Sequence, residues 1–79
     1  MMNYTYVLKS EKDQKYYIGW SNNLKQRVLS HNKGNVKATA SRRPLRLVYY
    51  EACLNEDKAI KRENFFKTGY GRRFLKTRL

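Results

Sequence analysis

The distribution of hydrophobic and polar positions predicts three β-strands. Residues 4–9 (YTYVLK) and residues 15–20 (KYYIGW) are rich in aromatic and β-branched side chains, which favour an extended backbone. The polar residues 10–14 between them predict a turn, so the chain is expected to begin with a β-hairpin. Residues 45–53 (LRLVYYEAC), which follow Pro44, show the same enrichment and predict a third strand.

The two strands of the predicted hairpin each present a distinct face, because side chains alternate along a strand. One face of the first strand carries Tyr4, Tyr6 and Leu8. One face of the second strand carries Tyr17 and Gly19. The pattern alone does not fix the register in which the strands pair.

A first helix is predicted over residues 24–33. Asn22 or Asn23 can cap its start, because a short side-chain oxygen can accept hydrogen bonds from free backbone N–H groups. Gly34 can end the helix, since glycine readily adopts the left-handed conformation found after helices. Residues 34–44 then form a basic loop that leads to the third strand.

Two further helices are predicted after the third strand. Asn55 can cap a helix over residues 56–67. Gly69 and Gly71 are expected to interrupt the helical structure after this helix, because glycine is a poor helix former. A short basic helix over residues 72–78 is expected to close the chain.

The predicted order of elements is therefore ββαβαα. This order is typical of an α+β fold in which helices flank a small three-stranded, antiparallel sheet. A sequence of 79 residues has the size of one domain, so residues 1–79 are expected to form a single domain with a small core.

Charge narrows the choice of partner. The sequence has 18 Lys and Arg against 6 Asp and Glu, which gives a formal net charge of +12. So basic a protein favours a polyanion, with nucleic acid as the first candidate and an anionic membrane surface as the second. The membrane hypothesis fits less well, because the basic residues are spread along the chain rather than gathered on one amphipathic helix.

The cellular compartment is indicated by cysteine content and hydropathy. The single cysteine, Cys53, excludes an internal disulfide and a cysteine-based zinc site. No apolar run approaches the length of a membrane span, and the start of the chain lacks a signal-type segment. These features predict a cytoplasmic protein with no membrane partner.

Glu63 has an unusual position on the second predicted helix. Ala59, Ile60 and Phe66 form the apolar stripe of this helix. Glu63 falls in the middle of the stripe, where a carboxylate is costly unless its charge is compensated. One interpretation is that it reaches solvent or pairs with a Lys or Arg. The other is a metal ligand, because a carboxylate in a basic groove suits Mg²⁺ held jointly with water and substrate phosphate.

Arg27 and His31 share one face of the first predicted helix, beside the apolar Leu24 and Val28. The arginine guanidinium presents paired donors that match a phosphate, and histidine can move a proton near neutral pH. The alternative is a solvated arginine and a partly buried histidine that have no chemical role.

The seven tyrosines offer a further proton-transfer group. Tyrosine is usually a strand former, and it acts as a base only where positive charge or a metal lowers its pKa from about 10. Taken together, these features indicate phosphodiester hydrolysis. The basic surface would bind the backbone, a carboxylate would hold a metal, an arginine would stabilise developing charge, and a tyrosine or histidine would move protons.

Two short motifs give these residues a common context. Residues 17–19 (YIG) are preceded by residues 4–6 (YTY) and followed in order by Arg27, His31 and Glu63. In this arrangement the chain resembles the GIY-YIG nuclease domain over essentially its whole length, with YIG intact and YTY in place of GIY. It is most similar to small stand-alone bacterial members, which resemble the N-terminal nuclease domain of the excision-repair protein that makes the damage incision.

The resemblance implies the same ββαβα-type sheet and a divalent-metal endonuclease that uses Mg²⁺ or Mn²⁺. Glu63 would be the metal ligand, and Arg27 would contact the scissile phosphate. Tyr6 and Tyr17 would share the activation and positioning of the attacking water, with His31 assisting. The pattern does not decide which tyrosine is the base.

Two more expectations concern the rest of the site. Many family members use an asparagine after the catalytic Glu, but none follows Asn64 here. Residues of the basic loop are expected to line the nucleic-acid groove: Lys37, Thr39, Arg42 and Arg43.

The sequence leaves the target open. Larger members carry separate DNA-binding domains, so this nuclease domain is expected to select DNA by structure, such as a flap, branch, nick or single strand, in repair or recombination. A protein partner or a homodimer would supply further specificity. The alternative is a non-catalytic nucleic-acid-binding module with a vestigial site, which the charge supports equally. The intact set of motif residues favours the enzyme.

Overall fold

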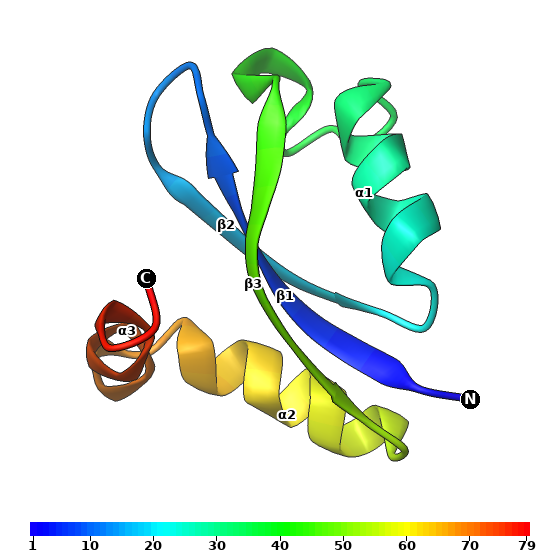
Figure 1. Ribbon diagram of the computed structural model, residues 1–79, viewed down its shortest axis with the longest axis vertical. Coiled ribbons are helices and arrows are strands. Elements are labelled where there is room, and N and C mark those ends of the chain that lie inside the picture. The colour runs from blue at the N-terminus through cyan, green and yellow to red at the C-terminus, as the bar shows by residue number, and fades with distance from the viewer.

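The computed structural model describes residues 1–79 as an antiparallel sheet with helices on both faces (Figure 1). The strands are β1 (Asn3–Ser10), β2 (Tyr16–Ser21) and β3 (Leu45–Cys53). The helices are α1 (Leu24–Asn32), α2 (Glu56–Phe66) and α3 (Gly69–Lys76), with a short 3-10 helix η1 (Ala40–Arg42) before β3. The predicted α+β class and the order ββαβαα are confirmed. None of these helices combines the length and the apolar character that a membrane span requires.

β1 is the central strand of the sheet, whose strand order is β2-β1-β3. On the α1 side, Tyr6 and Leu8 form the centre of one apolar cluster. On the opposite side, Val7 packs against Phe66 of α2 and Leu75 of α3. Because both faces of β1 are covered, the strand is buried almost along its whole length. The small protein therefore has two cores that share one strand.

Strand pairing fixes the register that the sequence leaves open. In the β1–β2 ladder, Tyr6 lies opposite Gly19 and Leu8 lies opposite Tyr17. Directly opposed residues point to the same face, so these four positions all face α1. The β1–β3 ladder shifts register just after Val7, which is a β-bulge.

The two ends of α1 are held as the sequence predicts. The side chain of Asn23 accepts the backbone N–H of Gln26 at 3.2 Å. At the other end Gly34 adopts a φ of +82°, and its N–H donates to the carbonyl of His31 at 3.2 Å. This left-handed turn directs the chain away from the helix and into the basic loop.

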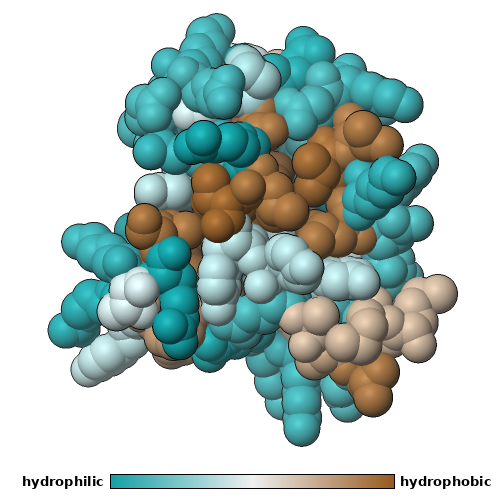
Figure 2. Space-filling model, viewed as in Figure 1, coloured by the Kyte–Doolittle hydropathy of each residue, from teal (hydrophilic) through white to brown (hydrophobic).

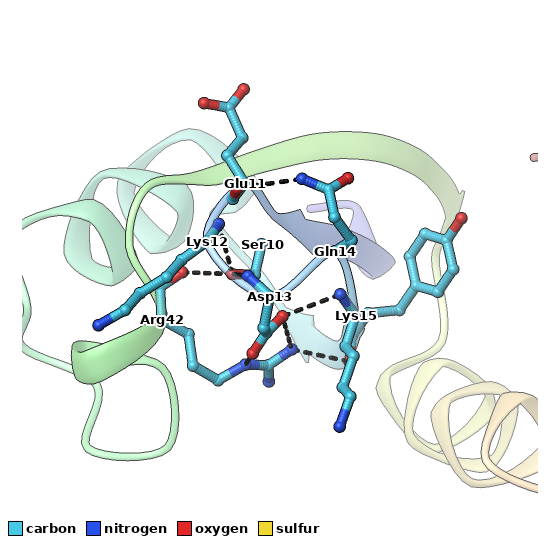
Figure 3. Close-up of polar contacts among 8 residues, drawn as sticks. Ser10, Glu11, Lys12, Asp13, Gln14, Lys15 and Arg42 are labelled. Carbon is cyan, nitrogen blue, oxygen red and sulfur yellow. Dashed lines mark hydrogen bonds and ion pairs between the residues drawn. The ribbon is translucent and has the colours of Figure 1, made fainter.

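The turn of the β1–β2 hairpin is tied to η1 by one serine and one ion pair (Figure 3). Ser10 Oγ donates to the carbonyl of Arg42 at 2.6 Å. The same oxygen accepts the backbone N–H groups of Lys12 and Asp13, each at 3.1 Å. The Arg42 guanidinium donates to Asp13 Oδ2 at 2.7 Å and holds the pKa of that carboxyl at about 2. Arg42 is thus engaged in fixing the loop before β3.

The sequence prediction for the last helix is wrong at its start. Gly69 and Gly71 lie inside α3, and only Lys67 and Thr68 separate α3 from α2. Thr68 starts α3, because its Oγ1 accepts the backbone N–H of Gly71 at 3.1 Å. A Cβ at Gly71 would overlap the carbonyl oxygen of Phe65 in α2. This glycine therefore permits a close approach of two helices, which outweighs its poor helix propensity.

The two glycines of α3 are expected to respond oppositely to alanine. Gly71→Ala should lower the free energy of unfolding by about 1–3 kcal/mol, because the new methyl group overlaps the α2 backbone. Gly69→Ala should leave it unchanged or raise it by up to about 1 kcal/mol, since its Cβ would meet no atom within 4 Å. Urea unfolding of both variants measures the difference. Equal stabilities would contradict the close packing of α2 and α3.

Candidate active site

The hydroxyl of Tyr6 joins a chain of hydrogen bonds beneath α1. Arg27 Nε donates to Tyr6 Oη at 3.3 Å. Tyr6 Oη lies 2.9 Å from His31 Nε2, and His31 Nδ1 lies 2.7 Å from Thr39 Oγ1. An unbroken series of hydrogen bonds therefore connects the Arg27 guanidinium on α1, the Tyr6 hydroxyl on β1, the His31 ring on α1 and the Thr39 hydroxyl in the basic loop.

The direction of these bonds follows from Thr39. Its hydroxyl has the backbone carbonyl of Val36 as an acceptor at 3.5 Å, so we assign it as the acceptor of the hydrogen bond with His31 Nδ1. This assignment puts the imidazole proton on Nδ1 and leaves Nε2 as the acceptor of the Tyr6 O–H. Tyr6 is then a donor to His31 and an acceptor from Arg27.

Gly19 provides the space that the Tyr6 hydroxyl occupies. A Cβ at Gly19 would lie 2.5 Å from Tyr6 Oη and 3.2 Å from Cε2 of Tyr17. Side chains do not tolerate such an approach, so the missing side chain lets the Tyr6 phenol extend over β2. On α1, Arg27 and His31 lie about one turn apart and reach the same hydroxyl. The YIG glycine thus has a physical role in the site.

Burial sets the charge of the cluster. It lowers the pKa of His31 to about 4, and the nearby Arg27 charge acts in the same direction. Burial also raises the pKa of Tyr6, although the hydrogen bond from Arg27 opposes that effect. The hydrogen bond to Tyr6 in turn raises the pKa of Arg27. Near neutral pH the imidazole and the phenol are therefore neutral, and the guanidinium carries the charge.

The two motif tyrosines differ in access to solvent. Tyr6 is completely buried, whereas Tyr17 is half-buried. The Tyr17 ring packs edge-on against the His31 imidazole, with ring centroids 5.0 Å apart. Tyr17 is therefore the tyrosine through which this cluster meets water.

Glu63 approaches the cluster from α2. Its charge is one of the causes that raise the pKa of Tyr6, so the carboxylate acts on the phenol electrostatically. Lys67, about one helical turn further on, donates to Glu63 Oε2 at 2.7 Å. The Glu63 side chain is 16% exposed, and its Oε1 has no hydrogen-bond partner in the protein. The ion pair of the first interpretation is present, and one carboxylate oxygen remains free for another ligand.

The Tyr6 cluster has few acidic side chains nearby that could bind a metal ion. Nowhere in residues 1–79 do three or more His, Cys, Asp or Glu side chains gather as a metal site. Glu63 would be the one carboxylate near the Tyr6 cluster, and water and substrate phosphate would complete the coordination. Mg²⁺ is commonly bound in this way, with one or two carboxylates and several waters. The donor set therefore fits a divalent ion that is held jointly with substrate.

Two of the predicted groove residues have structural partners. Thr39 is completely buried, and its hydroxyl orients the His31 ring. Arg42 is paired with Asp13 at the hairpin turn. These side chains position the site, and neither projects freely into solvent.

The other two predicted groove residues are exposed. Arg43 Nε donates to the carbonyl of Ala40 at 2.8 Å, and Lys37 has no hydrogen-bond or ion-pair partner in the protein. Both charges are accessible to an anion from outside.

Two details of the site go beyond what the sequence predicted: which basic residue pairs with Glu63, and which group Thr39 contacts. The Glu63–Lys67 pair has a detectable signal, because residues four apart on a helix are neighbours. The orienting role of Thr39 has no such signal. Thr39 meets His31 only because the loop folds back under α1.

The buried imidazole predicts a pH dependence of stability. His31 is the only histidine, and folding lowers its pKa from 6.5 to about 4. As the pH falls below about 6.5 the unfolded chain binds a proton that the folded chain refuses. The free energy of unfolding should therefore fall by on the order of 3 kcal/mol between these two values. Urea unfolding at several pH values measures this slope.

A His31→Gln variant is the control, because glutamine does not titrate. Its free energy of unfolding should change much less between about pH 7 and pH 5. The same slope in parent and variant would show that another group is responsible.

Comparisons with known proteins agree with this geometry. The family model described as the GIY-YIG catalytic domain matches residues 2–76. The UPF0213 protein CPE1444 of Clostridium perfringens is 46% identical over 67 residues, which cover 84% of this chain and 71% of that protein. A UPF0213 protein of Pediococcus acidilactici is 48% identical over 67 residues, which cover 81% of this chain and 67% of that protein.

A solved structure extends the likeness to the fold. The solution NMR structure of the UPF0213 protein BH0048 from Bacillus halodurans superposes with a TM-score of 0.60 at 28% identity. The superposition covers 98% of this chain and 84% of that one. The family model spans nearly the whole chain, including every residue of the Tyr6 cluster. This protein therefore belongs to the GIY-YIG nuclease family, and UPF0213 proteins are among its relatives.

Proposed function

We propose that this protein is a metal-dependent endonuclease that hydrolyses phosphodiester bonds in DNA and selects its target by structure rather than by sequence. The observation that carries the proposal is the hydrogen-bonded cluster of Tyr6, Arg27 and His31, with Tyr17 at its open side and Glu63 within electrostatic reach. Family membership supplies the reaction class.

Binding of the DNA backbone rests on charge. A net charge of +12 favours association with a polyanion through counterion release, which carries no sequence information. The exposed Lys37 and Arg43 lie on the loop that also supports His31, so they are proposed to contact the backbone beside the cluster.

Arg27 is the proposed contact to the scissile phosphate. Its Nε is used for Tyr6, which leaves the terminal nitrogens of the planar guanidinium for a phosphate. The hydrogen bond to Tyr6 fixes the direction of the fork before substrate arrives. A donor held in place in this way stabilises negative charge that develops in the transition state.

The proposed roles of the two tyrosines differ. Tyr6 is completely buried and donates a hydrogen bond to His31, so it serves as a positioning residue for Arg27. Tyr17 is half-buried and reaches solvent, so it is the tyrosine proposed to contact the attacking water. His31 Nε2 accepts the hydrogen bond from the Tyr6 hydroxyl and keeps the phenol in place.

Glu63 is the residue proposed to hold the metal ion. A bound Mg²⁺ or Mn²⁺ would polarise the phosphoryl group and lower the pKa of a bound water. Lys67 pairs with one carboxylate oxygen and leaves Oε1 free, so the chain presents a negative ligand in an otherwise basic protein. The role of this chain's residues is to bind and orient that ion together with substrate.

The pathway and partners are proposed more broadly. Structure-selective cleavage suits DNA repair or recombination, where flaps, branches and nicks occur. A protein partner or a second copy of the chain would narrow the target further. The competing function is a non-catalytic nucleic-acid-binding module, and the Glu63–Lys67 ion pair favours it, because Lys67 neutralises the carboxylate without a metal.

The substitution Glu63→Gln distinguishes enzyme from binder. It keeps the side-chain shape and removes the charge that a hard divalent cation requires. Cleavage of labelled branched, nicked, single-stranded and duplex DNA with Mg²⁺ or Mn²⁺ should fall to the level seen with EDTA. Binding should be equal or tighter, because a repulsive charge has left the basic surface. Stability should change by no more than about 0.5 kcal/mol, the usual worth of such an ion pair.

Glu11→Gln is the matched control, because it removes one negative charge from an exposed turn outside the cluster. It should leave cleavage unchanged. A folded Glu63→Gln variant that still cuts would remove Glu63 from the site. A parent protein that binds DNA but cuts none of these substrates would favour the binding module.

Arg27 should matter for the rate far more than for affinity. Arg27→Ala should lower cleavage by about 10²–10³ while duplex binding changes little, because its contact strengthens in the transition state. Arg27→Lys should restore only part of the rate, since a point charge cannot reproduce the paired donors. Single-turnover cleavage and fluorescence anisotropy measure the two effects. An alanine variant that cuts at the parent's rate would make Arg27 a structural partner of Tyr6 only.

A further inference from the structure

A groove of about 590 Å³ lies on the α1 face of the sheet. It is bounded by the two asparagines before α1, by the first two turns of α1, and by residues of β1 and β3. In Figure 2 a hydrophobic area lies between the top of β3 and α1, and hydrophilic side chains surround it. No residue of the Tyr6 cluster lines this groove, so the site described above does not account for it.

Two tyrosines form one wall of the groove. Tyr4 and Tyr50 pack edge to face, with ring centroids 5.9 Å apart and an interplanar angle of 62°. Tyr50 is 52% exposed, and Leu29 of α1, which also lines the groove, is 45% exposed. Neither tyrosine hydroxyl has a hydrogen-bond partner in the protein. A large aromatic surface is thus open to a flat ligand.

The charge of the groove points to the class of ligand. Lys25 is the one charged side chain in its lining, and there is no acidic residue. The adjacent Asn22 contributes an amide, which offers both a donor and an acceptor to a ligand edge. An aromatic wall, a polar amide and a cation together match a nucleobase and its phosphate. Proteins that bind single strands combine stacking side chains with positive charge in this way.

The groove also adjoins the proposed nuclease site. Tyr4 and Tyr6 lie on the same face of β1, about 7 Å apart along the strand. Leu24 and Val28, which line the groove, flank Arg27 on α1. A nucleotide bound in the groove would therefore be a near neighbour of a phosphate at Arg27.

We propose that this groove binds one unpaired nucleobase of the substrate, stacked against Tyr50, beside the phosphate held by Arg27. The inference rests on the proposed function and deepens it, because it makes a single-stranded or gapped segment the preferred substrate. A fully paired duplex keeps its bases stacked inside the helix and cannot fill the groove without unpairing.

The test measures binding without cleavage. The probe is a short oligothymidylate that carries one 2-aminopurine, whose fluorescence reports stacking, and it is titrated with protein in EDTA. Tyr50→Ala should weaken binding about 5- to 150-fold, which corresponds to the ~1–3 kcal/mol of base–aromatic stacking. Tyr50→Phe should retain both affinity and fluorescence change. Duplex affinity should stay within about twofold, because phosphate contacts dominate it.

Tyr70→Ala is the matched control. Tyr70 is 74% exposed, but it lies on α3 at the opposite face of the sheet, so its loss should leave single-strand binding unchanged. Urea unfolding checks that both alanine variants are folded. Sedimentation of the free parent and of Tyr50→Ala tests whether a second copy of the chain covers the groove instead.

The outcomes separate this inference from the nuclease itself. Equal single-strand binding by the Tyr50→Ala and Tyr70→Ala variants would overturn the base site and leave the proposed nuclease intact. A parent dimer that Tyr50→Ala dissociates would also overturn it, since the groove would then be an interface. A loss specific to single strands, in a protein that cuts no DNA with Mg²⁺, would support the base site and sink the nuclease.

Discussion

The hydroxyl of Tyr6 is the point on which the arrangement of the molecule depends. It is completely buried, and a buried hydroxyl that lacks hydrogen bonds typically costs a protein about 1–3 kcal/mol. Two side chains of α1, Arg27 and His31, provide its partners. The position of α1 over the sheet is therefore coupled to satisfying one phenol, in addition to the contacts of its apolar side chains.

This constraint extends to the edge strand and to the loop. The phenol needs the open space at Gly19 on β2, and the His31 ring needs the hydroxyl of Thr39 to hold its second nitrogen. The loop that carries Thr39 is in turn anchored to the hairpin through Ser10 and Arg42. One polar network thus links the central strand, the edge strand, α1 and the loop before β3. Its members are the residues that position a cationic guanidinium beside a half-buried tyrosine.

The opposite face of the sheet holds α2 in position. Val7, Phe66 and Leu75 form an apolar cluster, and the hydroxyl of Thr5 on β1 donates to the carbonyl of Ala59 in α2 at 2.9 Å. This packing fixes α2, and α2 carries Glu63. The Glu63 charge acts on Tyr6, whose hydroxyl is held from the other side of the sheet by α1. Bringing these groups together therefore requires both faces of the central strand β1 to be covered.

The sequence by itself determined the class of the fold and most of its elements. The strand over residues 45–53 and the cap at Asn23 follow from local preferences, which neighbouring residues decide. Local preference fails at Gly71, because a contact with Phe65 in another helix outweighs the helix propensity of glycine. Propensity describes a residue in isolation, and it cannot register that kind of contact.

The candidate site divides in the same way. The chemical types of Tyr6, Tyr17, Arg27, His31 and Glu63, and their order, were enough to suggest phosphodiester hydrolysis and the family that the comparisons support. Tertiary structure decided the burial and the pairing of the site residues, which come from distant parts of the sequence. It buried Tyr6 and left Tyr17 half-exposed, engaged Arg42 with Asp13, and turned Thr39 inward against His31. Burial and pairing depend on which residues from distant segments meet, and only the packing of both faces of β1 brings those segments together.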